Sequence, residues 1–180
     1  NNFDELSYER MYSEEQGGTY KQYPSLKMWS DYFPFSKVIG LDKENFLIDP
    51  NDNRIEYKYF NADNAHTITE ILKDERPKVI IDDGSHIFAH QQETFFIGFQ
   101  ALESGGIYII EDLNSIQGNF RTGYPPTEKI FQGGLKTLVQ SPAFKADFDH
   151  EEGVLNQITS IQFSKSFSSG KINTVAIRKK

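Results

Sequence analysis

VIIDDGSH, residues 79–86, is a short apolar run of β-forming residues that ends abruptly in two adjacent carboxylates. IYIIED, residues 107–112, repeats the pattern. Between them lies a segment long enough for a helix, residues 90–103, which Ser104-Gly105-Gly106 follows. A strand, a helix and a strand at this spacing predict a βαβ unit whose two strands are parallel and adjacent.

The carboxyl ends of parallel strands face the ligand crevice in an open α/β sheet. Four acidic residues are therefore expected at one edge: Asp82, Asp83, Glu111 and Asp112. Their repulsion is costly unless a cation, a shared proton or a ligand's amine and hydroxyl groups offset it. Because the chain has no cysteine and these ligands are all oxygens, a hard cation such as Mg²⁺ is favoured.

Two histidines follow the first acidic pair. His86 lies three residues after Asp83 and is expected beside the metal, where a neutral imidazole can accept a proton. His90 begins the expected helix and is interpreted as a surface or capping residue. A simple Asp-Gly turn would explain Asp83-Gly84, but it explains neither Asp82 nor the second acidic pair, so a functional interpretation is favoured.

The composition is that of an ordinary globular protein. The chain has 180 residues, of which 37% are hydrophobic and 25% charged, and one domain is expected over residues 1–180, with residues 1–24 as an arm and 25–180 as the core. The net charge of -7 argues against non-specific nucleic-acid binding. Without a transmembrane-length apolar run or a signal-peptide pattern, a cytoplasmic protein with no membrane partner is expected.

The remaining elements follow from periodicity and turn residues. Expected helices cover residues 25–33, 67–73 and 129–139, expected strands cover residues 37–42, 55–60, 158–164 and 172–178, and a loop that could cover a substrate spans residues 113–126. The last two strands form a hairpin, and Arg178, Lys179 and Lys180 are interpreted as a solvated tail. The order predicts an α/β fold with a doubly wound, mostly parallel sheet and a C-terminal antiparallel hairpin.

Two further acids follow strands. An acid at the position of Asp42 commonly accepts hydrogen bonds from ribose hydroxyls of a nucleotide-type cofactor, although a strand-end turn explains it equally well. Asp63 could meet an adenine amino group, but Asn61-Ala62-Asp63-Asn64 is also ordinary turn and N-cap chemistry.

VIIDDGSH, the helix, Ser104-Gly105-Gly106 and IYIIEDL together resemble the class I S-adenosylmethionine-dependent methyltransferases. More narrowly, they resemble the metal-dependent macrolide and sugar O-methyltransferases of the mycinamicin type, with their rhamnosyl O-methyltransferase and cephalosporin hydroxylase relatives. SLKMWSDYFP followed by VIGLD is similar to the family's helix and second strand, so the resemblance runs from about Ser25 to Leu113. It implies a Rossmann-like fold, S-adenosylmethionine and Mg²⁺ as cofactors, and a place in antibiotic biosynthesis.

The resemblance assigns roles by position. Asp83, Glu111 and Asp112 match the family's metal ligands, and His86 matches its proposed general base. The cofactor residues are Asp42 at the ribose, Asp63 near the adenine and Asp82 close to the methionine end. The family also places a first strand and a glycine-rich turn before the SLKMW helix. MYSEEQGGTYKQYP stands there, with Gly17-Gly18 but no apolar strand before it, so this strand and turn are expected to be atypical or missing.

The resulting hypothesis is Mg²⁺-assisted transfer of a methyl group from S-adenosylmethionine to a hydroxyl of a sugar or small polyol, with His86 taking the proton. A non-catalytic methyltransferase-like binding module would suit an altered first strand. A metal-dependent hydrolase would keep the carboxylates but leave Asp42 and Asp63 without a role. The expected partner is a small hydroxylated molecule, and because the family's relatives often pair, a homo-oligomer is the assembly to test.

Overall fold

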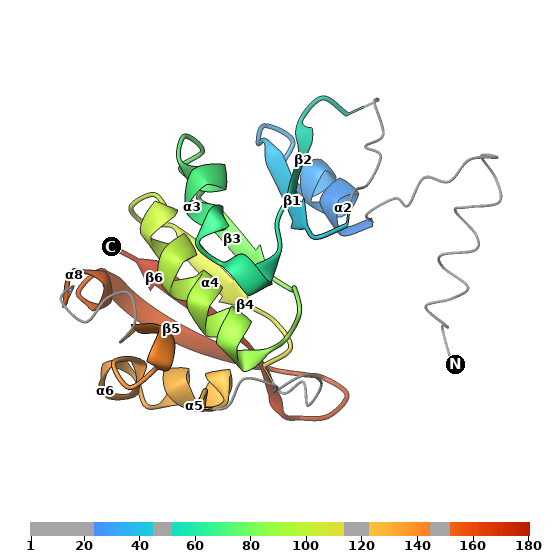
Figure 1. The fold of residues 1–180 in the computed structure, drawn as a ribbon. Coiled ribbons are helices and arrows are strands. Elements are labelled where there is room, and N and C mark those ends of the chain that lie inside the picture. The colour runs from blue at the N-terminus through green and yellow to red at the C-terminus, as the bar shows by residue number, and fades with distance from the viewer. Residues whose placement is uncertain (1–23, 45–51, 114–122, 145–151) are drawn as a thin grey trace. The chain divides into compact units, whose positions relative to one another are not determined.

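The structure is a computed structural model that describes residues 24–44, 52–113, 123–144 and 152–180 (Figure 1). It separates into two compact units, Asn1–Phe60 and Asn61–Lys180, and each is described by itself. Whether the whole chain acts as a single domain stays a prediction. The expected arm, the glycine pair at residues 17–18 and most of the expected loop at residues 113–126 lie outside the described residues.

The first unit packs one helix against a pair of parallel strands. These elements are α2 (Pro24–Tyr32), β1 (Val38–Asp42) and β2 (Ile55–Tyr59). Gly40 lies at the centre of β1, where an added Cβ would come within 2.5 Å of Leu26 Cδ1 and 3.2 Å of Tyr57 Cδ2. A side chain at this position would have to displace the side chain of Leu26, so glycine allows the helix to pack this closely on the strand.

A partly buried group of polar residues links the helix of the first unit to the segment before β2. Arg54 donates hydrogen bonds to the backbone oxygens of Ser30 (2.7 Å) and Pro34 (3.1 Å) and to the carboxylate of Asp52. The hydroxyl of Ser30 also donates to Asp52 Oδ2 at 2.7 Å. These bonds, led by that from Ser30, lower the pKa of Asp52 to about 2.

The second unit contains a four-stranded sheet in the order β3-β4-β6-β5. Its strands are β3 (Val79–Asp82), β4 (Ile107–Ile110), β5 (Ile158–Lys165) and β6 (Ile172–Lys179). β3 and β4 are parallel, whereas β6 runs antiparallel to both β4 and β5. The predicted fold class, α/β with parallel strands and a C-terminal antiparallel hairpin, is confirmed.

Helix α4 (Phe88–Ala101) connects β3 to β4 and lies over the sheet (Figure 1). The ring of Phe95 meets Tyr108 of β4 at 5.3 Å and Phe131 at 4.9 Å between centroids, both edge to face. Phe96 and Phe99 are equally buried, which confirms the predicted core role of this helix. The other helices of the described residues are η1 (Ala62–Asn64), α3 (Thr67–Leu72), α5 (Thr127–Gln132), α6 (Leu135–Leu138) and α8 (Glu152–Leu155).

The interpretation of the C-terminal basic residues as a solvated tail is wrong for Lys179. β6 includes this residue, and its ammonium group donates to the backbone oxygens of Phe99 (3.2 Å), Gln100 (2.8 Å) and Leu102 (2.8 Å). These are carbonyls at the C-terminal end of α4, where a cation is stabilising. Burial lowers the pKa of this ammonium group. Within the described residues, no helix has the length and hydropathy needed to cross a membrane.

Candidate metal and cofactor site

Three potential metal ligands meet where β3 and β4 end. Asp83 and His86 follow β3, Asp112 follows β4, and one ligand atom from each lies within 4.8 Å of the other two. The parallel pairing, with Asp82 opposite Ile110, makes both strands leave the sheet at the same edge. The βαβ connection is thus what brings these side chains together.

The backbone at two of these residues is unusual. His86 has φ 57° and Asp112 has φ 50°, a left-handed conformation that is uncommon for residues other than glycine. Such conformations cost about 1–3 kcal/mol each and persist where the surrounding structure enforces them, often at functional sites. In this arrangement His86 Nε2 lies 3.7 Å from Asp112 Oδ2.

The carboxylates of this edge oppose one another's ionisation. Burial raises the pKa of Asp83; the charge of His86 acts against this rise and the Asp112 carboxylate adds to it. Burial also raises the pKa of Glu111, and repulsion from Asp83 and Asp112 raises it further. A bound cation would reverse this repulsion.

The charges of Asp83 and Asp112 raise the pKa of Glu111, but Glu111 does not belong to the group of three ligands that lies within 4.8 Å. Its backbone is held on both sides: its N–H donates to Asp82 O at 2.9 Å, and its carbonyl accepts from Gln91 Nε2 at 3.0 Å. Gln91 lies in the first turns of α4 and is 2% exposed. Gln91 was not predicted from the sequence; a glutamine among the apolar residues of this helix was the available signal.

Asp112 is held by a residue from the last strand. Asn173 of β6 donates from Nδ2 to Asp112 Oδ1 at 3.0 Å, and its carbonyl accepts the N–H of Leu113 at 3.0 Å. Antiparallel pairing of β6 with β4 brings Asn173 to this place. No pattern near residue 173 in the sequence indicates it.

Asp82 is organised by the sheet and helix beneath it. Its Oδ2 accepts from Thr94 Oγ1 at 2.8 Å and lies 3.5 Å from the Tyr108 hydroxyl, while its Oδ1 accepts from Gly84 N at 3.3 Å. Burial raises the pKa of Asp82, and the hydrogen bond from Thr94 is the largest effect in the opposite direction. Its predicted place near the methionine end of the cofactor stays a prediction.

His90 is neither a surface residue nor a cap, so that prediction is wrong. It is 6% exposed, its Nε2 lies 3.1 Å from Asp63 Oδ1, and its Nδ1 lies 2.8 Å from Ser85 Oγ. The physical reason is that α4 begins at Phe88, two residues earlier than expected, after Ile87 as N-cap. His90 therefore lies in the first turn, on the packed side of the helix.

Asp42 ends β1 in the first unit. Its Oδ1 accepts the N–H of Glu44 at 3.0 Å, and its backbone oxygen accepts the N–H of Phe60 at 2.7 Å. This is the geometry of a strand-end turn, the simpler of the two interpretations. The role of Asp42 at a cofactor ribose stays a prediction.

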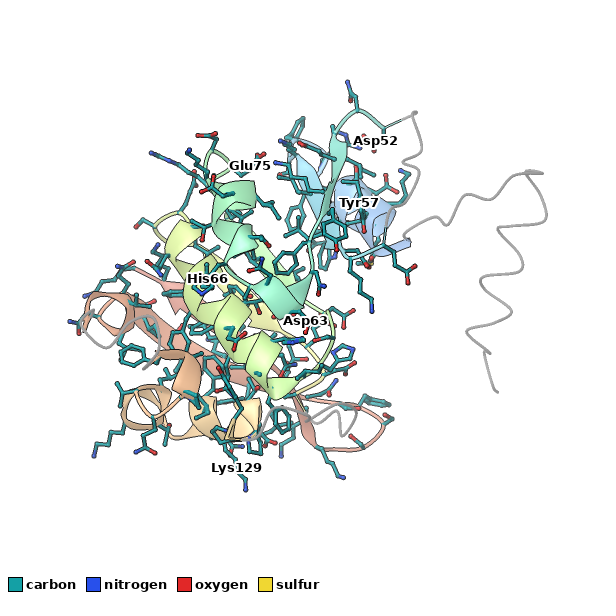
Figure 2. The ribbon with its side chains drawn as sticks, in the orientation of Figure 1. Asp52, Tyr57, Asp63, His66, Glu75 and Lys129 are labelled. Carbon is teal, nitrogen blue, oxygen red and sulfur yellow. The ribbon has the colours of Figure 1, made fainter. Side chains whose placement is uncertain are left out.

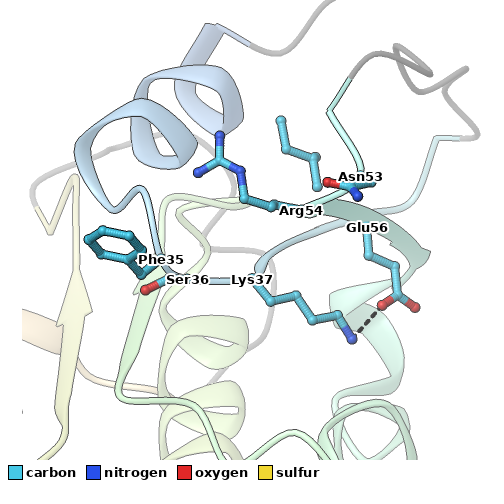
Figure 3. A pocket seen from close by; sticks show the side chains of 7 residues that line it. Phe35, Ser36, Lys37, Asn53, Arg54 and Glu56 are labelled. Atoms are coloured by element: carbon cyan, nitrogen blue, oxygen red, sulfur yellow. Dashed lines mark ion pairs between the residues drawn. The ribbon is translucent and has the colours of Figure 1, made fainter.

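The first unit also carries an open hollow in its surface, drawn in Figure 3, which contains none of the predicted site residues. Lys37 crosses one side of it, with Nζ 2.6 Å from Glu56 Oε2. The lining residues are Phe35, Ser36, Lys37, Asn53, Arg54, Ile55 and Glu56.

The donors at the end of β3 and β4 fit a hard divalent cation, which prefers carboxylate oxygens. A second observation supports a ligand site at this point. Among the described residues, His86 Nδ1 is one of the few buried polar side-chain atoms with no hydrogen-bond partner. Buried polar groups of proteins are normally satisfied, so an orphaned nitrogen beside paired carboxylates suits a site that binds something.

No family model matches the chain. Several curated relatives match part of it. The 8-demethyl-8-(2-methoxy-alpha-L-rhamnosyl)-tetracenomycin-C 3'-O-methyltransferase of Streptomyces olivaceus is 38% identical over 92 residues, which are 49% of this chain and 23% of that enzyme. The mycinamicin VI 2''-O-methyltransferase of Micromonospora griseorubida is 35% identical over 91 residues, 49% of this chain and 22% of the enzyme.

A third relative, the 8-demethyl-8-alpha-L-rhamnosyl tetracenomycin-C 2'-O-methyltransferase of Streptomyces olivaceus, is 32% identical over 120 residues, 64% of this chain and 31% of the enzyme. The chain thus spans between 22% and 31% of the length of these curated relatives.

Among solved structures, the MycE methyltransferase from the mycinamycin biosynthetic pathway, in complex with Mg, SAH and mycinamycin VI, matches with a TM-score of 0.58 and 22% identity. The match covers 97% of this chain and 48% of that one, and it shows the fold. The resemblance carried by VIIDDGSH and IYIIEDL is therefore confirmed: the curated relatives compared are named as O-methyltransferases of sugar-bearing or related natural products.

Proposed function

We propose that this protein is an S-adenosylmethionine-dependent, Mg²⁺-assisted O-methyltransferase that acts on a hydroxyl group of a sugar or small polyol natural product. The observation that carries the proposal is the meeting of Asp83, His86 and Asp112 within 4.8 Å at the carboxyl ends of two parallel strands. The relatives support the class of reaction, because those compared are named as O-methyltransferases and two of the names contain a rhamnosyl group.

Asp83, Glu111 and Asp112 would hold the metal ion. When bound, Mg²⁺ would lower the pKa of a coordinated substrate hydroxyl and fix its direction, and S-adenosylmethionine would supply an activated methyl group. The charges support this assignment: burial and mutual repulsion raise the pKa of Asp83 and of Glu111, and a cation is the group that removes the repulsion.

His86 would accept the proton. S-adenosylmethionine would give up its methyl group to the substrate oxygen and keep the electron pair on its sulfur, and the hydroxyl proton would pass to the imidazole of His86. Asp112 Oδ2, 3.7 Å from His86 Nε2, would stabilise the imidazolium that forms. A positioned general base of this kind contributes about 10²–10⁴ in rate.

Asp42, Asp63 and Asp82 would contact the cofactor at its ribose, its adenine and its methionine end. The support for Asp63 and Asp82 is that each contacts α4, Asp63 through His90 in the first turn and Asp82 through Thr94 in the middle of the helix. A cofactor gains affinity when such groups are already ordered before it binds.

Calorimetric titration of S-adenosylhomocysteine into the full chain, with and without Mg²⁺, tests the proposal. We expect micromolar binding in the wild type, and a response to Mg²⁺ that Asp83→Asn removes. Asp74→Asn is the matched control, because Asp74 is exposed and lies outside the cluster. Failure of the folded wild type to bind would overturn the proposal. Binding of the cofactor without methyl transfer to a panel of sugar-bearing acceptors would instead indicate a non-catalytic binding module.

A further inference from the structure

His90 connects two loops that the proposed function assigns to different ligands. On one side, Nε2 lies 3.1 Å from Asp63, which the proposal places near the cofactor adenine. On the other side, Nδ1 lies 2.8 Å from the hydroxyl of Ser85. Ser85 stands in the chain between Asp83 and His86, the proposed metal ligand and general base.

The chemistry of the three groups sets one direction for the hydrogen bonds. The Asp63 carboxylate can only accept, so of the two tautomers of a singly protonated ring, the contact of 3.1 Å at Nε2 favours the one with its proton on Nε2. Nδ1 is then an acceptor, and the hydroxyl of Ser85 donates to it. The Ser85 oxygen is left to accept the N–H of Ile87 at 3.4 Å. The chain of bonds thus orients the turn that carries the proposed metal ligand and base.

The ring of His90 is well placed to hold both loops. It is 6% exposed and belongs to the first turn of α4. The same helix holds Asp82 through Thr94 and the backbone of Glu111 through Gln91. A ring anchored in this way cannot follow one loop without moving the other.

We propose that His90 is a positioning residue that ties Asp63 to the turn bearing Asp83 and His86, each through a separate ring nitrogen. This inference rests on the proposed function for the identity of the two ligands. The structural link itself consists of the two contacts on the ring. The proposal requires that each of these contacts can be removed without the other, because each ring nitrogen contacts one loop.

Two substitutions remove the contacts to Asp63 and to Ser85 separately. His90→Asn places an amide near the position of Nδ1 and preserves the contact to Ser85, whereas His90→Gln reaches the position of Nε2 and preserves the contact to Asp63. We expect His90→Asn to weaken S-adenosylhomocysteine binding roughly tenfold and to leave Mg²⁺ affinity near that of the wild type. We expect His90→Gln to weaken Mg²⁺ binding roughly tenfold and to leave S-adenosylhomocysteine affinity near that of the wild type. His90→Ala should weaken the binding of both ligands.

Two controls separate positioning from a general loss of stability. Ile68→Val removes one buried methylene from the same unit, and His66→Asn changes an exposed histidine, labelled in Figure 2, by the same substitution. Both affinities should stay within about twofold of the wild type in these variants. The proposal is overturned if His90→Asn and His90→Gln reduce the two affinities to the same extent, or leave both unchanged.

The ring itself provides a measurement that needs neither ligand. Nitrogen-15 NMR of the ligand-free chain should show His90 as a single tautomer with its proton on Nε2, and Asp63→Ala should produce a mixture. A wild-type ring that already exchanges between tautomers would contradict the link. If the wild type binds neither Mg²⁺ nor S-adenosylhomocysteine but shows the single tautomer, the proposed function fails and the link between the loops stands.

Discussion

Asn173 donates a hydrogen bond of 3.0 Å from its Nδ2 to Asp112 Oδ1, so a residue of the last strand holds a proposed metal ligand that lies 61 residues earlier in the chain. The carbonyl of Asn173 accepts the N–H of Leu113 at the same place, which fixes the backbone as well as the side chain. The geometry of the acidic cluster therefore depends on β6 as much as on the βαβ unit.

Asn173→Ala should weaken Mg²⁺ binding by about tenfold, because residues that orient a metal ligand typically contribute 10–100-fold to affinity. The backbone bond to Leu113 remains in this variant, so the fold should persist. Calorimetric titration of Mg²⁺ is the measurement, with Thr174→Ala on the same strand as the control. An unchanged affinity would show that Asp112 needs no support from β6.

His86→Asn should retain Mg²⁺ and S-adenosylhomocysteine binding but lose about 10²–10⁴ in turnover, the contribution of a general base. Asparagine is chosen because it tolerates the left-handed backbone at this position, where φ is 57°. Initial rates and two binding titrations check this. Should Mg²⁺ affinity collapse together with the rate, His86 would be a metal ligand and not the base.

The contribution of Asp83 and Glu111 to the stability of the metal-free protein should fall as pH rises through the carboxylate range, opposite in sign to the contribution of Asp52, whose pKa is lowered. The pKa of Asp83 lies above its ordinary value of 3.8 and that of Glu111 above 4.5. Between the ordinary and the raised pKa the folded chain binds more protons than the unfolded chain, so the free energy of unfolding decreases with rising pH, and the whole cost is present above the raised pKa.

Mg²⁺ should relieve this cost, because it binds the deprotonated carboxylates. Thermal unfolding at a series of pH values, with and without Mg²⁺, measures both effects. We expect stabilisation of about 2.7 kcal/mol at a Mg²⁺ concentration 100 times Kd near neutral pH, and less as pH falls toward the ordinary carboxyl pKa. A Mg²⁺ effect that does not depend on pH would contradict the assignment of these acids.

Lys179→Met should lower the free energy of unfolding by about 1–3 kcal/mol. The substitution keeps much of the apolar stem but leaves the carbonyls at the end of α4, of Phe99, Gln100 and Leu102, without their charged donor. Urea unfolding is the measurement, and Lys180→Met, at an exposed neighbouring position, is the control. Equal losses in the two variants would mean that the ammonium group does not cap the helix.

The unit of strand, helix and strand followed from the sequence because its signals are local. Apolar runs of three and four residues, helix-length spacing and a pair of acids at the end of each run all occur within residues 79–112. The start of α4 was less predictable. Its N-cap, Ile87, makes no side-chain capping bond, so no cap residue in the sequence marks the helix start. The expected boundary at His90 came two residues late, and the burial of His90 was missed with it.

The sequence by itself determined the parallel strands and the closing hairpin, and it indicated which carboxylates end β3 and β4, because these are properties of neighbouring residues. The tertiary structure decided which polar side chains support them: His90 between Asp63 and Ser85, Gln91 on Glu111, and Asn173 on Asp112. Those contacts arise when α4 packs on the sheet and β6 pairs with β4. The physical reason is that packing and strand pairing join residues far apart in the chain, and no local pattern of residue types encodes which distant partner a polar side chain will meet.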